Sequence, residues 1–92
     1  NVQYRLTAGP VAIELLVNRV VADTLSESRL SADQVIEPEA DGRFRVGATV
    51  ADTLDLRGWI KSYGPLVEVA GPPVLRDQIA GEIRKASELY AR

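Results

Sequence analysis

The 92-residue sequence contains no cysteine and no histidine. Without cysteine, disulfide bonds and thiolate metal sites are excluded, and the composition is compatible with an intracellular protein. Without either residue the usual pairs of nucleophile and base are missing, so a serine or threonine nucleophile would need a lysine base or a terminal amine. The only lysines, Lys61 and Lys85, are interpreted as solvated charges on helices. We therefore assign no catalytic residue and expect no enzyme.

A strong excess of one charge sign is also missing, since eleven basic residues stand against thirteen acidic ones for a net charge of -2. This balance argues against a protein that binds nucleic acid through a global positive field. The longest apolar-rich stretch, residues 10–22, is interrupted by Glu14, Asn18 and Arg19 and is too short to cross a bilayer. We expect a cytoplasmic protein with no membrane contact.

Sequence motifs typical of metal binding or nucleotide binding are absent as well. The carboxylates Glu37, Glu39 and Asp41 lack the spacing of a metal-binding loop, and the glycines form no nucleotide fingerprint. We expect no metal and no cofactor.

What the chain does have is the composition of a folded domain, with 46% hydrophobic and 26% charged residues. Its length fits one compact core and is too short for two. Because the sequence begins at Asn1 without a methionine, we expect residues 1–92 to be a single domain cut from a longer protein.

The first part of the chain predicts a strand followed by a helix. Residues 2–7 alternate apolar and polar side chains, which is typical of a strand with one buried face. Pro10 suits the first turn of a helix, and apolar residues at helical spacing extend that helix to about Ala22. The charged, serine-rich stretch 23–33 is interpreted as a loop with a frayed helix at its start.

The middle of the chain predicts a hairpin. Residues 34–37, before Pro38, allow a short edge strand, and Asp41-Gly42 is a strong turn signal. In the strand that follows, one set of alternating residues is expected to face the core: Phe44, Val46, Ala48 and Val50.

The last part predicts a helix, a strand and a second helix. Asp52 is the predicted N-cap of a helix that ends at Gly64, with a buried face that includes Trp59 and Tyr63. Residues 66–70 predict a strand, and Pro72 and Pro73 start the C-terminal helix. One apolar stripe follows that helix: Leu75, Ile79, Ile83, Ala86 and Tyr90. We expect Leu75 and Tyr90 to belong to the core.

This order of elements predicts an α+β fold. The simplest arrangement is a ferredoxin-like βαββαβ antiparallel sheet with helices on one face and an additional C-terminal helix. On the open face, Arg5, Arg43 and Arg45 could form a strip that contacts an anion or a phosphate backbone, or could be solvated and paired with Glu68. On the outer side of the first predicted helix, the aliphatic residues Val11 and Leu15 are interface candidates: with the apolar stripe of the C-terminal helix they could form a contact surface for another chain or domain, or could be buried locally.

From Asp41 onward the residues follow a family pattern. It runs from Asp41-Gly42 through the segment from Leu56 to Gly64, which contains Trp59 and Tyr63, and then continues through Pro72-Pro73-Val74-Leu75-Arg76 and Tyr90. This half of the chain resembles the WCX domain, the C-terminal extension of bacterial WYL-domain transcriptional regulators. Ala70-Gly71 departs from the family, which often has a bulkier residue and a glutamate before the proline.

The resemblance implies a non-enzymatic regulatory and dimerisation domain of a cytoplasmic, helix-turn-helix DNA-binding regulator. The parent would bind DNA through an N-terminal domain absent from this chain, and a central WYL domain would sense an effector, which is a nucleic acid or nucleotide in several members. Two alternatives remain open from the residues alone: a small-molecule-binding ferredoxin-like regulatory domain, and an acylphosphatase-like hydrolase.

Overall fold

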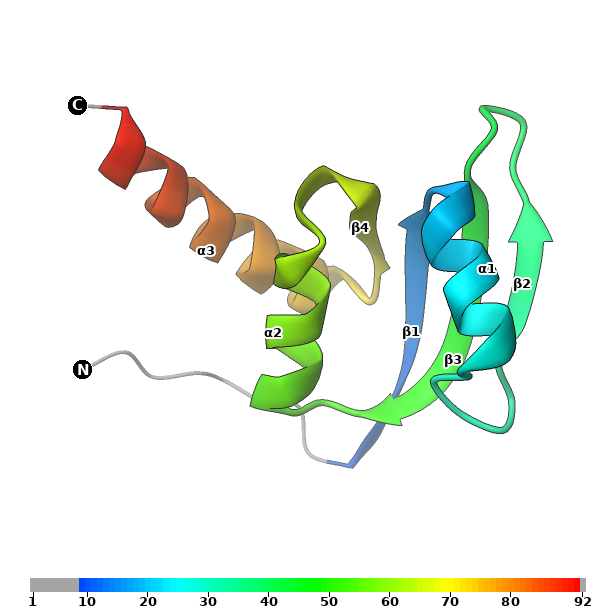
Figure 1. The fold of residues 1–92 in the computed structure, drawn as a ribbon. Helices are drawn as coiled ribbons and strands as arrows, with labels where there is room; N and C mark the ends of the chain where they lie inside the picture. Colours follow the sequence, from blue (N-terminus) through cyan, green and yellow to red (C-terminus); the bar gives the residue numbers. More distant parts are fainter. Residues whose placement is uncertain (1–8, 92) are drawn as a thin grey trace.

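The computed structural model describes residues 9–91, so the strand predicted over residues 2–7, with Arg5, lies outside the described residues. Figure 1 shows an antiparallel sheet with two helices against one face and a third helix at one end. The elements are β1 (Pro10–Val17), α1 (Arg19–Glu27), β2 (Val35–Pro38), β3 (Phe44–Ala51), α2 (Leu54–Ser62), the short 3₁₀ helix η1 (Gly64–Leu66), β4 (Val67–Gly71) and α3 (Pro73–Tyr90).

The sheet has the order β2-β3-β1-β4, and each neighbouring pair is antiparallel. The two central strands pair along their full length, from Pro10 opposite Ala51 to Val17 opposite Phe44. With α1 after β1 and α2 after β3, this is the βαββαβ arrangement of a ferredoxin-like fold. The predicted fold class is confirmed, including the additional C-terminal helix.

A helix was predicted over residues 10–22, but most of this segment forms the strand β1, so that prediction is wrong. Val11, Ile13, Leu15 and Val17 alternate into the core, and Leu15 is 0% exposed. The proposal that Val11 and Leu15 form an exposed interface is therefore also wrong. Both side chains face the helices from β1, and Leu15 lies opposite Val46 on β3 and Val69 on β4.

Helix α1 begins directly after β1 and ends later than predicted. The side chain of its N-cap, Asn18, accepts a hydrogen bond from the backbone N–H of Val21 at 3.0 Å. The helix extends to Glu27, into the stretch predicted as a loop with a frayed helix at its start. The buried Gln34 then fastens the loop: its side chain accepts from the Leu30 N–H and donates to the Leu25 carbonyl, both at 2.9 Å.

The hairpin of β2 and β3 agrees with its prediction. Gly42 has φ +88°, which a left-handed turn position requires. Val46 and Ala48 are buried in the core, and Phe44 and Val50 pack against it from the same face of β3.

Helix α2 ends at Ser62, two residues before the glycine predicted to terminate it, and it has a different N-cap. The Thr53 side chain accepts from the Leu56 N–H at 3.0 Å, so the predicted N-cap Asp52 is wrong. Trp59 and Tyr63 pack against the core with ring centroids 5.2 Å apart in an edge-to-face arrangement. Gly64 has φ +56°, the left-handed conformation predicted for it.

Helix α3 starts at Pro73 and runs past the edge of the domain. Leu75 and Ile79 are buried against β4 and α2, as predicted for the first half of the stripe. Beyond Ile79 the helix projects away from the sheet (Figure 1), and Tyr90 is 90% exposed. The expectation that Tyr90 belongs to the core is wrong, because no described part of this domain lies beneath the last two turns.

Candidate functional site

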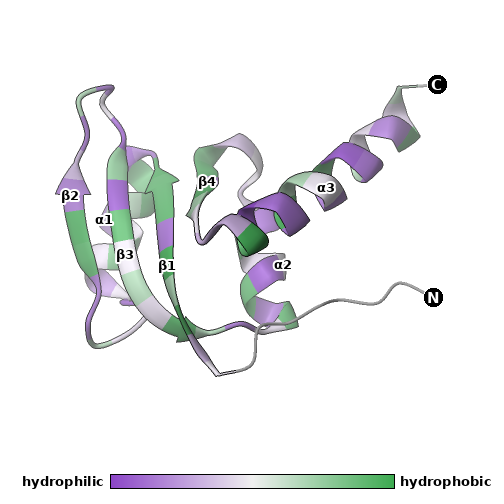
Figure 2. Ribbon diagram, turned by 180° about the vertical axis from the view of Figure 1, so that it is seen from behind, coloured by the Kyte–Doolittle hydropathy of each residue, from purple (hydrophilic) through white to green (hydrophobic). Residues whose placement is uncertain are grey.

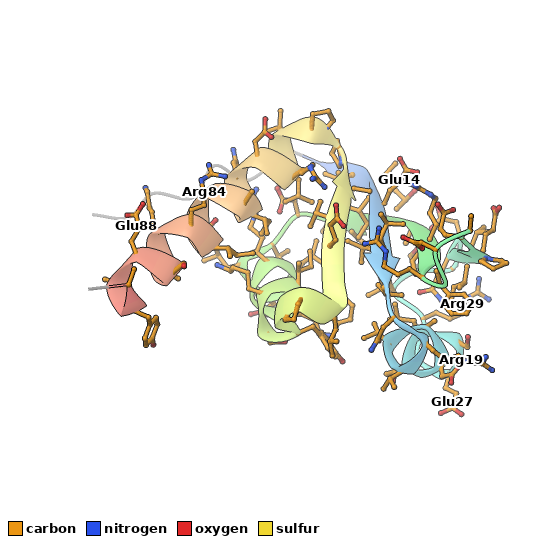
Figure 3. The ribbon with its side chains drawn as sticks, turned by 90° about the horizontal axis from the view of Figure 1, so that it is seen from above. Glu14, Arg19, Glu27, Arg29, Arg84 and Glu88 are labelled. Carbon is orange, nitrogen blue, oxygen red and sulfur yellow. The ribbon has the colours of Figure 1, made fainter. Side chains whose placement is uncertain are left out.

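The open face of the sheet carries the arginines predicted for an anion contact, but their guanidinium groups are already paired. Arg43 binds Glu68 at 2.7 Å and Asp41 at 2.8 Å. Arg45 binds Glu14 at 3.2 Å and Glu39 at 3.3 Å, and Arg76 from α3 also binds Glu68. In Figure 3 Glu14 lies on the side of the sheet opposite to α1.

These pairs stabilise the charged form of each partner. Hydrogen bonds from Arg76 and then Arg43 hold the pKa of Glu68 below its ordinary value. The same contacts, with Glu68 first, raise the pKa of Arg43. An incoming phosphate would have to displace carboxylates from both arginines, so the free arginine strip is not formed by the described residues. The alternative pairing of Arg43 with Glu68 is confirmed.

A second charged group lies inside the domain. Arg57 on α2 is 1% exposed and binds Asp52 through two parallel hydrogen bonds, Nε to Oδ1 at 2.9 Å and Nη2 to Oδ2 at 2.8 Å. The Asp52 side chain lies between the end of β3 and the start of α2. Because both groups are removed from water, the bidentate geometry is what makes their burial tolerable.

A carboxylate of α3, Glu82, extends the buried pair into a larger charged network. The carboxylate of Glu82 lies 3.9 Å from Nη1 of Arg57 and 2.5 Å from Nζ of Lys61. Lys61, which the sequence placed among the solvated charges, is therefore half-buried in an ion pair between α2 and α3. This network, Asp52-Arg57-Glu82-Lys61, fixes the position of α3 against α2.

A groove begins where that network reaches the surface. It has a volume of about 750 Å³ and lies between η1 and the projecting half of α3. Its floor is apolar and its rim is charged; the lining residues are Lys61, Gly64, Pro65, Glu82, Ile83, Lys85 and Ala86. On the other side of Pro65 and Ile83, a smaller hollow of about 310 Å³ reaches Val69 and Arg76.

The projecting half of α3 keeps two different faces even though it packs on nothing in the described chain. Ile83, Leu89 and Tyr90 are exposed apolar residues at helical spacing. Arg84 and Glu88 point to one side of the helix, away from α2 (Figure 3). Figure 2 shows the resulting alternation of hydrophobic and hydrophilic residues along this helix.

The features of a metal or phosphate centre are not found in this part of the chain. Residues 9–91 contain no group of three or more side chains placed to hold a metal ion. No helix among them has the length and apolar character needed to cross a membrane. The connection from β1 to α1 is Asn18 alone, and its side chain is used as the helix cap, so no phosphate-cradling loop follows β1.

Sequence reasoning missed Arg57, Gln34 and the groove. A signal for Arg57 was present, because it lies three residues before the buried Ile60 and thus on the inner side of α2. Gln34 gave no comparable signal, since its partners are backbone groups of a turn whose shape depends on the rest of the fold.

The fold and these surfaces define a small ferredoxin-like domain whose distinctive features are a projecting amphipathic helix and an adjacent groove. The chain belongs to the WCX domain family, which matches residues 9–87. A search of the curated proteins found no match. The predicted resemblance is therefore confirmed, and it extends over β1 and α1 as well as the C-terminal half.

Proposed function

We propose that this chain is the non-enzymatic regulatory domain of a WYL-type transcription regulator and that it works by protein contact, with a homodimer in the parent protein. Membership of the WCX domain family carries this proposal. The exposed apolar half of α3 supports it, because an amphipathic helix whose apolar side has no partner is typical of an interaction surface.

In this proposal the adjacent WYL domain senses an effector, for which a nucleotide or nucleic acid is the expected class. DNA is bound by a separate N-terminal helix-turn-helix domain. The described surface supports this division of labour, since its open-face arginines are paired with carboxylates and offer no free basic track.

The full-length coding sequence and the assembly state of its product test the proposal. We expect a winged-helix reader and a WYL segment upstream of residue 1, and a dimer by light scattering of the purified parent. A parent without those segments would refute the regulator, and a monomeric parent would refute the homodimer.

The groove favours one second candidate, a small-molecule-binding regulatory domain. Its volume of about 750 Å³ and its apolar floor fall within the range of ligand sites. Thermal shift of the 92-residue chain against nucleotides and amino acids separates the two functions. Stabilisation by one metabolite class, with no response to oligonucleotides, would favour this candidate over the contact domain.

A further inference from the structure

The sheet ends at β4, and the outer side of this strand pairs with no other strand of the described residues. In the pairing of β4 with β1, the N–H of Asn18 donates to the carbonyl of Leu66 at 3.2 Å. Because hydrogen-bonded positions alternate along an antiparallel pair, the backbone groups of Val67 and Val69 point outward. The guanidinium of Arg76 agrees with this orientation, since its Nη1 donates to the carbonyl of Val69 at 2.7 Å.

The smaller hollow, of about 310 Å³, lies between this free edge and α3. On α3 its lining residues lie at helical spacing: Arg76, Ile79, Ala80 and Ile83. The side chains of Val67 and Val69 are buried in the core, so these residues offer the hollow their backbone edge. A helix is about 10 Å wide, and a hollow of this size holds less than one helical turn, which favours an extended chain as the occupant.

The two hollows adjoin each other along α3. Ile83 and Pro65 line both of them, and the wall on α3 continues from Ile83 to Ala86 in the larger groove. From Arg76 to Ala86 the helix rises about 15 Å, which is the length of about five extended residues. A chain that pairs with β4 in the smaller hollow can therefore continue into the groove beside η1.

The rim of the larger groove has an excess of positive charge. Lys61 and Lys85 lie on it with one carboxylate, Glu82, which is paired with Lys61 at 2.5 Å. Lys85 forms no ion pair with a carboxylate of the described residues. A strand that runs antiparallel to β4 passes Val69 before Val67, so it reaches this rim with its C-terminal end. A carboxylate at that end complements the charge of the rim.

We propose that the two hollows form one binding site for an extended peptide segment of a partner protein, acidic at its C-terminal end, which adds to β4 as an antiparallel strand. Its backbone bonds to the outward N–H and C=O of Val67 and to the N–H of Val69, while Arg76 keeps the carbonyl of Val69. Its alternate side chains pack toward Ile83, and its acidic end lies beside Lys85. The inference rests on the proposed function as a contact domain and names the kind of partner.

Panning of the 92-residue chain against a displayed library of random hexapeptides with free C-termini tests the ligand class. We expect enrichment of peptides with apolar residues at alternate positions and Asp or Glu in the last two. For an enriched peptide, Lys85→Glu should raise the dissociation constant at least about fivefold in fluorescence anisotropy, because it reverses the charge at the rim. Arg84→Glu is the matched control: it makes the same charge change on the side of α3 turned away from α2 (Figure 3) and should leave the binding unchanged.

Amide hydrogen exchange tests the strand addition. Saturation with the same peptide should slow the exchange of the N–H groups of Val67 and Val69 at least about tenfold, because both gain hydrogen-bond acceptors. The N–H of Glu68 points toward β1 and is the internal control, for which we expect little change.

The results distinguish the extended peptide from other occupants. A library without enriched sequences, or one that enriches apolar residues at helical spacing, overturns the extended peptide. Binding without slower exchange at Val67 and Val69 overturns the pairing with β4, and equal weakening by Lys85→Glu and Arg84→Glu overturns the contact at the rim. A metabolite that raises the melting temperature where no peptide is enriched assigns the groove to a small molecule. None of these results bears on the regulator or the homodimer, which the upstream sequence and the assembly of the parent test separately.

Discussion

At the residue scale, the buried pair of Arg57 and Asp52 connects several elements of the fold. Two charged groups with side chains 2% exposed would be strongly unfavourable if either were left alone. Their two parallel hydrogen bonds connect the end of β3 to α2, and Glu82 extends the connection to α3. One side chain therefore fixes the relative positions of three elements.

The change Arg57→Met is expected to lower the free energy of unfolding by about 3–5 kcal/mol, because it leaves the carboxylate of Asp52 buried without its main partner. Urea unfolding of the two single variants and the double variant Asp52→Ala/Arg57→Met measures this. The double variant removes both charges and should be more stable than Arg57→Met. A single variant with wild-type stability would mean that the interior tolerates the lone carboxylate.

Asp33 gives the domain a defined acid sensitivity. Its carboxylate accepts hydrogen bonds from the Ser31 hydroxyl and, at 2.9 Å, from the backbone N–H of Thr49 on β3. These bonds, with Ser31 first, lower the pKa of Asp33 from its ordinary value of 3.8 to about 2. Since the folded state holds the ionised form, the contribution of Asp33 is complete above its unfolded pKa and is lost as the pH falls through about 2.

We therefore expect the wild-type chain to lose stability between about pH 4 and about pH 2 more steeply than Asp33→Asn. Chemical unfolding at several pH values in this range provides the measurement. Glu27→Gln, which removes an exposed carboxylate at the end of α1, is the matched control and should keep the wild-type slope. Parallel pH profiles for the wild type and Asp33→Asn would show that this carboxylate is not held in its charged form.

At the element scale, how far the sequence predicts the fold depends on the strength of each periodic pattern. In β1 the outward positions include Ala12 and Leu16, so the two-residue alternation is blurred and a helical period fits equally well. Only pairing with β3 and β4 selects the strand, and that pairing is set by residues more than 25 positions away. β3 has less ambiguity, because its outward positions are polar or glycine until Ala51 at its end, and its prediction is confirmed.

The same dependence on distant partners explains which site residues could be predicted from the sequence and which could not. Gly64 could be predicted because a helix end needs a left-handed residue whatever surrounds it. The exposure of Tyr90 could not, because the stripe of α3 shows that the helix is amphipathic but not where the domain beneath it ends. Likewise, the pairing of Arg43 and Arg45 depends on the alignment of four strands.

Replacement by alanine is expected to change the stability in opposite directions at Gly58, inside α2, and at Gly64, just after this helix. Gly64→Ala is expected to lower the free energy of unfolding by about 1–2 kcal/mol, since φ +56° strains a residue with a Cβ atom. Gly58→Ala is the control: it lies inside α2 with no atom within 4 Å of an added Cβ, so it should stabilise by about 0.5–1 kcal/mol. Thermal melts of both variants decide; equal losses would indicate that α2 tolerates no added methyl group.

At the scale of the whole molecule, the domain divides into a self-sufficient body and a projecting half-helix. The body contains the buried core, which is built by β1, β3, β4 and the three helices. Its members include Ile13, Leu15, Val46, Ile60, Val69, Leu75 and Ile79. The residues of α3 after Ile83 add nothing to that core, since their side chains are exposed. Stability and assembly should therefore be separable along one helix.

A chain shortened to end at Ile83 tests this separation. We expect its free energy of unfolding to fall by less than about 1 kcal/mol, which corresponds to a shift in melting temperature of under roughly 8 °C, because residues 84–91 have no buried side chain. Self-association of the proposed homodimer should be weakened, because the exposed apolar residues Leu89 and Tyr90 are gone. Melting and sedimentation of the same sample measure both quantities. A shortened chain that unfolds at low temperature would show that the last two turns stabilise the body, and one that still dimerises would place the interface on the sheet or on α1.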